Sequence, residues 1–571
     1  MFAHFFTTRL TALATTFFCV ATQAFAGNTI TISPNFYHID NKQHIIVINK
    51  KVEDVNADAD ELRTHLVLDK DYIFVEPPLL VNTASSYQVK FQNITYTTYF
   101  TQLPIVHVDT DNEIVDSPSV LAKFLMSEAS GTITESNLGI EIRGSYSQTL
   151  PKKSYELSFW TDTKGDDSRD VRLLNMRTDN KWNLQALYNE PLRVNSKVAN
   201  TLWQNIHQIY YKDKEPEAKN GIDMAYVELF LNNEYKGLYA LSERIDRKQL
   251  KLKKYNNGIV GELYKASNWG PAILFTGLPA FDNSSLTWGG FEYKHPEEKI
   301  DWTNLYNFID FVENSSDQFF YSQYKAKFNL KNAVDYYIFL NLIRAVDNTE
   351  KNLYIAKYKT NEPYYYIPWD LDGTFGNNWF GSKDNITNDI RTNEFYKRLT
   401  KDNSPSGFNE TLYKRWEELR ATVITEKYIL DKFKEQQDYL LNNNIYQREH
   451  LVWDSFTYDD TYAEYTATWL RSRLAYLDGA FSKTSTVLKS SVGKQSATVS
   501  IYPNPANDFL FIETEGLPYE VLIQDMNGRM LLKTTLNGTL NKVALNSLAR
   551  GLYVVTVKNS RTLKTEKLII N

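Results

Sequence analysis

The most constraining feature of this 571-residue chain is a group of polar residues in a fixed order towards its centre. An apolar run over residues 334–346 predicts a buried helix that ends at Asp347. Asn352 follows, then two alternating runs that predict a β-hairpin, then Trp-Asp-Leu-Asp-Gly-Thr-Phe-Gly over residues 369–376. The order of helix, polar loop, hairpin and acidic turn predicts an α+β domain with a polar site.

This order of groups suits phosphoryl transfer. One carboxylate, from Asp347, would orient an attacking hydroxyl, while an amide and further carboxylates would hold magnesium on the phosphates. The candidates for the metal are Asn352, Asp370 and Asp372. Each motif is weak alone, because an Asp-x4-Asn spacing is frequent by chance and an acidic loop is more often a simple turn.

A second candidate feature is a strand, a Gly/Ser turn and another strand over residues 139–159. Backbone N–H groups of such a turn can hold an anion, and a lysine on the next strand can reach it. By period-two alternation, Lys153 shares the apolar face of Tyr155, Leu157 and Phe159, whereas Lys152 points outward. A hairpin with solvated lysines remains the alternative interpretation.

A helix over residues 193–206 precedes a hairpin over residues 227–242, which runs into the charged exit Glu243-Arg244-Ile245-Asp246. Hairpin, helix, hairpin and charged exit is the element order of the small lobe and hinge of a kinase. Many α+β domains share that order, so it is not decisive.

Taken in order, the central motifs resemble those of the CotH kinase family over roughly residues 104–482. The matching words are Arg-Gly-Ser-Tyr-Ser, Pro-Lys-Lys-Ser-Tyr, Asn-Asn-Glu-Tyr-Lys-Gly-Leu-Tyr-Ala-Leu-Ser-Glu, Asp-x4-Asn and Trp-Asp-Leu-Asp-Gly-Thr-Phe-Gly. The resemblance implies an atypical two-lobed protein-kinase-like fold, ATP with Mg²⁺ or Mn²⁺, and phosphorylation of Ser or Thr in secreted or surface proteins.

Carried over residue by residue, the resemblance makes Asp347 the catalytic aspartate and Asp370 the metal-binding aspartate, with Asn352 as the second metal ligand by spacing. Lys153 or Lys152 is the candidate phosphate lysine, and Glu243 would lie near the adenosine. There is no His-Arg-Asp triplet and no Gly-x-Gly-x-x-Gly loop, so phosphate capture would rely on the lysine and on Arg143, Ser145 and Ser147 of the turn. The acid that pairs with the lysine is not identifiable, and Glu190 is only the nearest candidate.

The two ends of the chain indicate export. Residues 1–26 carry one early arginine, an apolar centre and the ending Ala-Phe-Ala, as a secretory signal peptide does. An amphipathic or transmembrane helix is the alternative, although the apolar centre is far shorter than the ~20 residues that span a bilayer. Residues 500–571 contain six short alternating runs, which predict a β-sandwich. Its words Tyr-Pro-Asn-Pro-Ala, Asp-Met-Asn-Gly-Arg and Gly-Leu-Tyr-Val-Val resemble the type IX secretion sorting domain of Bacteroidetes. An ordinary adhesive or carbohydrate-binding sandwich remains open.

These features predict a signal peptide (1–26), an N-terminal β-domain (27–103), a kinase-like domain (104–482), a linker (483–499) and a sorting domain (500–571). The acidic loop at residues 109–113 lacks the glycine and the closing acid of a calcium loop, so we interpret it as a polar turn. The expected partners are a Ser/Thr-containing protein substrate and the type IX secretion machinery. A catalytically silent surface scaffold or adhesin of the same fold is the alternative.

Composition excludes several other classes. The formal net charge of −6 argues against a nucleic-acid partner. The single cysteine, Cys19, lies in the expected signal peptide, so cysteine nucleophiles and Cys-zinc sites are excluded from the exported protein. The eight histidines form no His-Glu-x-x-His pair, and no later run is apolar for long enough to predict a transmembrane segment.

Overall fold

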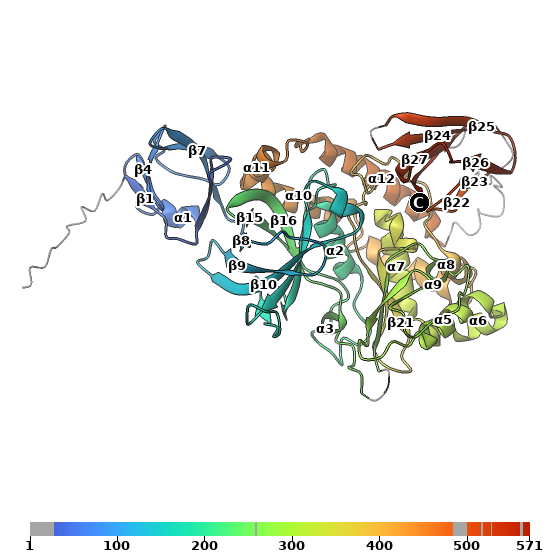
Figure 1. Ribbon diagram of the computed structural model, residues 1–571. Helices are drawn as coiled ribbons and strands as arrows, with labels where there is room; N and C mark the ends of the chain where they lie inside the picture. The colour runs from blue at the N-terminus through green and yellow to red at the C-terminus, as the bar shows by residue number, and fades with distance from the viewer. Residues whose placement is uncertain are drawn as a thin grey trace, which may run out of the picture. The chain divides into compact units, whose positions relative to one another are not determined.

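The computed structural model describes residues 28–483, apart from 257 and 259, and residues 499–570, apart from 515–517, 527 and 560–562. The expected signal peptide and most of the expected linker lie outside these residues. The chain forms two compact units, Met1–Lys483 and Thr484–Asn571 (Figure 1). Both helices and sheets are abundant, which confirms the expected α+β class. None of the described helices is long and apolar enough to cross a membrane.

The first unit begins with a seven-stranded sheet in the order β1-β4-β5-β6-β7-β3-β2. Its elements are β1 (Thr29–Thr31), β2 (Tyr37–Asp40), β3 (Ile45–Asn49), α1 (Val52–Val55), β4 (His65–Val67), β5 (Asp71–Phe74), β6 (Ser86–Phe91) and β7 (Ile94–Thr101). A buried hydrogen bond joins this sheet to the next part of the chain. In it, the Asn49 side-chain amide donates to the Ser127 carbonyl at 2.7 Å.

A closed β-barrel follows, in the order β10-β11-β14-β16-β15-β8-β9. Its strands are β8 (Ile105–Asp109), β9 (Val120–Ser127), β10 (Ile133–Arg143), β11 (Ser154–Trp160), β14 (Lys181–Gln185), β15 (Met224–Leu231) and β16 (Glu234–Ser242). The short elements between them are η1 (Tyr146–Thr149), β12 (Val171–Arg172), β13 (Thr178–Asp179) and α2 (Asn195–Ile206). Tyr155, Leu157 and Phe159 are buried in one core cluster with Trp182, so the predicted apolar face of β11 is confirmed.

The rest of the unit is a five-stranded sheet, β18-β19-β17-β20-β21, packed with helices. The strands are β17 (Glu262–Ala266), β18 (Thr287–Trp288), β19 (Phe291–His295), β20 (Leu353–Lys357) and β21 (Tyr364–Pro368). The helices of this part, with the short α3 that follows the barrel, are α3 (Arg247–Leu250), α4 (Pro271–Leu274), α5 (Thr303–Asn314), α6 (Asp317–Lys327), α7 (Leu330–Ile343), η2 (Asp347–Thr349), α8 (Glu394–Leu399), α9 (Phe408–Arg420), α10 (Glu426–Asn442), α11 (Ile445–Val452) and α12 (Thr461–Ala480).

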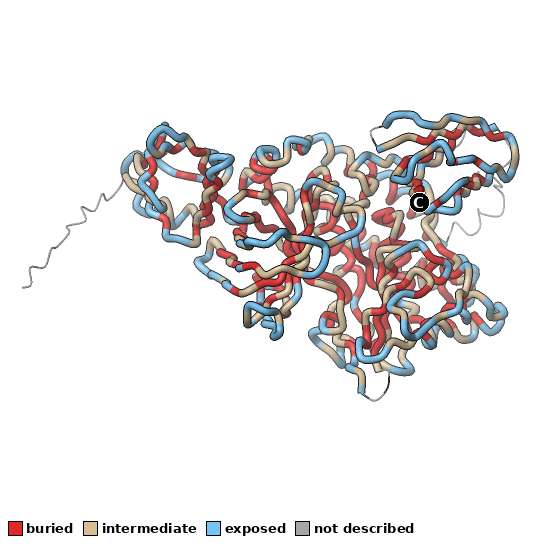
Figure 2. Tube along the Cα trace, viewed as in Figure 1, coloured by how far each residue is buried: buried red, intermediate tan, exposed pale blue. Residues whose placement is uncertain are grey.

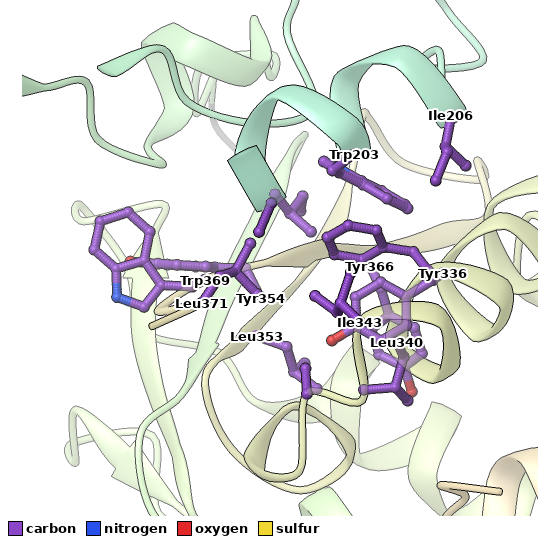
Figure 3. Close-up of a cluster of buried hydrophobic side chains, with 14 of the residues drawn as sticks. Trp203, Ile206, Tyr336, Leu340, Ile343, Leu353, Tyr354, Tyr366, Trp369 and Leu371 are labelled. Atoms are coloured by element: carbon purple, nitrogen blue, oxygen red, sulfur yellow. The ribbon is translucent and has the colours of Figure 1, made fainter. Parts of the chain in front are cut away.

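Helix α7 lies at the centre of this helical part. All of its residues except the first two are buried, as the apolar run predicted, although the helix ends at Ile343, before Asp347. Helix α2 packs against it, and the ring centroids of Trp203 and Tyr336 are 5.8 Å apart (Figure 3). Buried residues run through the middle of the unit, while its peripheral loops are exposed (Figure 2). The loop that follows α7 is therefore anchored to a rigid core.

The second unit consists of a three-stranded sheet, β22-β23-β26, and a four-stranded sheet, β25-β24-β27-β28, which share one apolar core. Its strands are β22 (Ser500–Tyr502), β23 (Phe509–Glu513), β24 (Tyr519–Asp525), β25 (Met530–Leu536), β26 (Leu540–Ala544), β27 (Gly551–Lys558) and β28 (Leu563–Ile570). The sequence patterns predicted six of these strands and missed β26. Only Val543 of β26 is buried, so its alternation of apolar and polar residues is weak.

Candidate active site

The first part of the site is the loop that joins α7 to β20. The helix ends because Arg344 adopts a left-handed conformation, with φ of 50°. Asp347 is half-buried and opens the short helix η2. Asn352 is also left-handed, and its N–H donates to the Ala266 carbonyl of β17 at 3.1 Å. Backbone contacts therefore fix both ends of the Asp-x4-Asn segment.

Asn348 holds this loop to the next part of the site, and the sequence patterns did not single it out. Its buried side-chain amide donates to the carbonyl oxygens of Asn352, at 2.6 Å, and Trp369, at 2.7 Å. The Trp369 N–H in turn donates to the Asn352 carbonyl at 3.0 Å. Because Trp369 directly precedes Asp370, the Asp-x4-Asn loop and the Asp-Leu-Asp turn form one hydrogen-bonded assembly.

Acidic groups converge on the Asp-Leu-Asp turn. Asp370 is exposed, with a left-handed φ of 58°, and Asp372 is half-buried and accepts a hydrogen bond from the Gly373 N–H at 2.8 Å. Burial, together with the charges of Asp370, Glu190 and Asp347, raises the pKa of Asp372 well above its ordinary value. The structure thus brings Asp347, Asp370 and Asp372 close together. The charge of Glu190 also acts on Asp372.

The Gly/Ser turn lies over the segment that follows Asp370. The ring of Tyr146 meets those of Trp379, at 4.8 Å, and Phe380, at 6.1 Å, edge to face. Gly144 has φ of 109°, and a Cβ there would lie 1.9 Å from the Ser147 Oγ, so the turn requires glycine. Ser145 is exposed and Ser147 is half-buried, with its hydroxyl 3.5 Å from the Arg143 carbonyl.

Arg143 is the predicted residue of the turn that lies nearest the acidic group. Its guanidinium lies over the Trp369 ring, 5.6 Å from the centroid. Burial lowers the pKa of Arg143, while the charge of Asp370 opposes that shift. Arg143 therefore packs on the residue that directly precedes Asp370, the metal-binding candidate.

The predicted orientation of the two lysines is wrong. Lys152 has no exposed surface, and its ammonium donates to Glu449 Oε1 and to the Leu238 carbonyl, both at 2.5 Å. Lys153 is half-buried and folds back onto the carbonyls of Gln148 and Leu150, both at 2.6 Å. The reason is that β11 begins only at Ser154, so the alternation of its faces does not extend to these residues.

Two other residues named from the sequence, Glu243 and Glu190, are hydrogen-bonded within the protein. The carboxylate of Glu243 is fully buried and accepts hydrogen bonds from the Arg177 N–H, the Asp223 N–H, the Lys219 ammonium and the Gln249 amide, which leaves it no free position for a nucleotide. Glu190 accepts from the Ser196 N–H at 3.1 Å, and the acid paired with the buried lysine is Glu449 of α11.

The chemistry of the acidic group suits a hard divalent cation. Asp370, Asp372 and Asn352 offer oxygen donors of the kind that Mg²⁺ and Mn²⁺ prefer, and repulsion between the carboxylates is relieved by a cation. Within the described part of the chain, however, no three His, Cys, Asp or Glu side chains are already arranged around a common metal position.

Known proteins resemble this chain over parts of its length. The chain is 23% identical over 352 residues to inner spore coat protein H of Bacillus subtilis (strain 168), covering 56% of this chain and 89% of that protein. The twitchin kinase region of C. elegans aligns over 90% of this chain and 98% of the twitchin chain, at 9% identity. The TM-score of 0.13 is too low to indicate a shared fold. Residues 500–571 match the model of the secretion system C-terminal sorting domain, which indicates export to the cell surface or secretion.

The model described as CotH kinase protein matches residues 140–477. That range is more than half of the chain, and it includes Arg143, Asp347, Asn352, Asp370 and Asp372. The match begins within β10, the third strand of the barrel along the chain, and ends within α12, the last described helix of the first unit. This chain belongs to the CotH kinase protein family.

Proposed function

We propose that this protein is an exported kinase that transfers the γ-phosphate of ATP to Ser or Thr side chains of secreted or surface proteins. The observation that carries the proposal is that hydrogen bonds from Asn348 join the Asp-x4-Asn loop to Trp369, the residue before Asp370, so that the two motifs form one assembly. The family match and the sorting tail support the reaction class and the location of its substrates.

Asp347 orients the acceptor in this proposal. Its carboxylate accepts the proton of the Ser or Thr hydroxyl as the hydroxyl oxygen bonds to the γ-phosphorus and the bond to the ADP oxygen breaks. Phosphoryl transfer passes through a loose transition state, so positioning contributes more than strong base catalysis. The hydrogen bonds of Asn348 give this loop the rigidity that positioning requires.

Asp370, Asp372 and Asn352 would hold Mg²⁺ or Mn²⁺. A divalent cation there neutralises charge on the phosphates and screens the three neighbouring carboxylates from one another. Arg143 and the turn around Ser145 and Ser147 would cover the phosphates from the barrel side, in place of a glycine-rich loop. The side chains of Lys152, Lys153 and Glu243 have no part in this arrangement, because each is engaged within the protein.

The proposal is tested by incubating the exported chain with γ-labelled ATP and Mg²⁺ or Mn²⁺, alone and with a Ser/Thr-rich secreted protein. Label on serine or threonine that is absent from Asp347→Asn protein supports the kinase. Metal-dependent ATP binding with no transfer to any acceptor, or no binding at all, favours the scaffold or adhesin.

A further inference from the structure

Lys265 lies beside the acidic group, although no motif singled it out. It lies on β17 directly opposite Tyr354 of β20, so the two side chains share one face of the sheet. Tyr354 meets Trp369 edge to face at 5.9 Å, and Arg143 lies over the Trp369 ring. Lys265, Tyr354, Trp369 and Arg143 therefore form a continuous row of side chains, with the buried Tyr354 and Trp369 in the middle, and Asp370 directly follows Trp369. We call this row the Lys265–Arg143 surface.

The two cations of this surface lack partners. Within the described residues, neither Lys265 nor Arg143 makes an ion pair or a side-chain hydrogen bond, yet both are half-buried. Their cationic neighbours differ, since Arg244 is paired with Glu156, and Lys294 with Glu292. Glu292 lies opposite Lys265 on β19, but its carboxylate is hydrogen-bonded to Lys294 and Ser267. Two partly dehydrated cations that no carboxylate contacts directly would be stabilised by an anionic ligand.

The electrostatic field is consistent with that geometry. Burial and the charges of Lys294 and Arg143 lower the pKa of Lys265, whereas the charges of Glu292 and Asp370 oppose that shift. Lys265 and Arg143 therefore lie close enough to act on each other and on the same carboxylate. An anion placed between them would relieve their repulsion, and a cation on Asp370 would bring that anion closer.

Other basic residues near the Gly/Ser turn do not compete for this role. Lys152 is sealed in the protein with Glu449, and Lys153 is bound to two carbonyl groups of its own turn. Either lysine would have to break buried or half-buried hydrogen bonds to reach a ligand. Lys265 and Arg143 have no such bonds to lose.

We propose that Arg143 and Lys265 form an anion-binding pair that holds the polyphosphate of the nucleotide, with Lys265 as the phosphate lysine of this protein. The assignment rests on the proposed function for the identity of the nucleotide. The polyphosphate is favoured over an acidic acceptor peptide because the pair flanks Asp370, where a metal ion would bridge to the phosphates. The Tyr354 and Trp369 rings form the floor between the two cations.

The test is titration calorimetry of the full exported chain with inorganic tripolyphosphate, Mg²⁺–ATP and adenosine. Lys265→Met and Arg143→Gln should each weaken tripolyphosphate and ATP binding by about tenfold or more, the effect of losing one charge-assisted hydrogen bond. Adenosine carries no phosphate, so its affinity should change by less than about threefold. Lys265→Arg, which keeps the charge, should retain most of the affinity for tripolyphosphate.

Lys251→Met is the matched control. It removes the same charge from an exposed ion pair with Glu217 and should leave all three affinities unchanged. Thermal unfolding of each variant would identify a loss of binding that comes from a loss of folding, in which case Lys265→Arg decides. Unchanged ATP affinity in Lys265→Met would overturn the pair, as would a wild-type protein that does not bind tripolyphosphate. Lys265-dependent binding without phosphate transfer would support the pair and refute the kinase.

Discussion

The ammonium of Lys152 lies 2.5 Å from Oε1 of Glu449, and neither side chain has any exposed surface. The two residues are 297 positions apart, because Lys152 lies two residues before β11 and Glu449 lies on α11. Arg193 Nε also contacts Glu449 Oε1 at 3.2 Å, and the Leu238 N–H donates to Oε2 at 2.9 Å. This single carboxylate therefore joins the barrel to a helix from the end of the first unit.

Removal of the Glu449 carboxylate should strongly destabilise the protein. Glu449→Gln leaves Lys152 and Arg193 buried without a counter-charge, and we expect it to lower the free energy of unfolding by about 3–5 kcal/mol. Urea unfolding at neutral pH would measure the change. The double variant Lys152→Met/Glu449→Gln should lose less than the sum of the two single variants, because it leaves fewer uncompensated charges. Strictly additive losses would contradict the coupling.

The same pair shows where sequence patterns stop being informative. Helix α11 escaped prediction because two of its four buried residues are the ionic Arg448 and Glu449, so the helix has no apolar stripe. The alternation argument that placed Lys152 outward failed because the strand begins two residues later. The role of Asn348 could not be predicted from the sequence, because it depends on two carbonyl groups that only the fold brings together.

Motifs local to one segment were predicted better. Apolar periodicity identified α7 and the β20–β21 hairpin, and hydrogen bonds join the Asp-x4-Asn loop to the Asp-Leu-Asp turn. The roles of Asp347, Asn352 and Asp370 stay predictions. Lys265 lies between those motifs and the barrel in the sequence, and nothing in its own neighbourhood marks it. Its position follows from the pairing of β17 with β20, a long-range contact that no local pattern encodes.

The contact between the N-terminal sheet and the barrel should be sensitive to acid. His38 of β2 is buried against His107 of β8, with ring centroids 4.9 Å apart, and burial together with the charge of His107 lowers the pKa of His38 to about 3. Asp109, 3.3 Å from His107, is the acidic group at this contact. The unfolded chain takes up the proton near pH 6.5, so stability is complete above that pH and falls towards pH 3.

This loss should reach about 1.4 kcal/mol per pH unit within that window. His38→Phe removes the titrating group and keeps a ring against Phe230, so its stability should fall less steeply between pH 7 and 5. Urea unfolding at several pH values would measure the slope. The exposed His44→Asn is the control and should keep the wild-type slope. An unaltered slope in His38→Phe would contradict the role of His38.

Arg344 fixes the segment that follows the acidic turn. Its guanidinium bonds both carboxylate oxygens of Asp389, at 2.9 and 3.0 Å, and Asp384 at 2.6 Å. Although burial opposes it, these two carboxylates raise the pKa of Arg344. These carboxylates supply a permanent opposite charge to Arg344.

Arg344→Lys should therefore loosen this segment. Lysine cannot reproduce the bidentate geometry, so the free energy of unfolding should fall by about 1–3 kcal/mol, and amide hydrogens around residues 384–391 should exchange faster. Arg420→Lys is the matched control, because Arg420 makes a similar bidentate pair with Asp478 elsewhere. Equal exchange of residues 384–391 in both variants would refute the assignment.

The two aspartates of the site should separate binding from transfer. If Asp370 holds the metal on the phosphates, Asp370→Asn should weaken Mg²⁺-dependent ATP binding by about tenfold or more and abolish transfer. In the proposed mechanism Asp347 acts on the acceptor hydroxyl, which nucleotide binding does not require. Asp347→Asn should leave ATP affinity within a few-fold and reduce transfer by about 10²–10⁴-fold, as for an interaction made only in the transition state.

Calorimetry of ATP binding beside a transfer assay would measure both effects, with the exposed Asp111→Asn as a control for the change in charge. Equal losses of binding in the Asp347 and Asp370 variants would mean that the two roles are wrongly divided. If both variants bound ATP and transferred phosphate like the wild type, the acidic group would not be the site of chemistry. The separation is expected because Asp370 is exposed on the surface shared with Arg143, whereas Asp347 is half-buried at the start of η2.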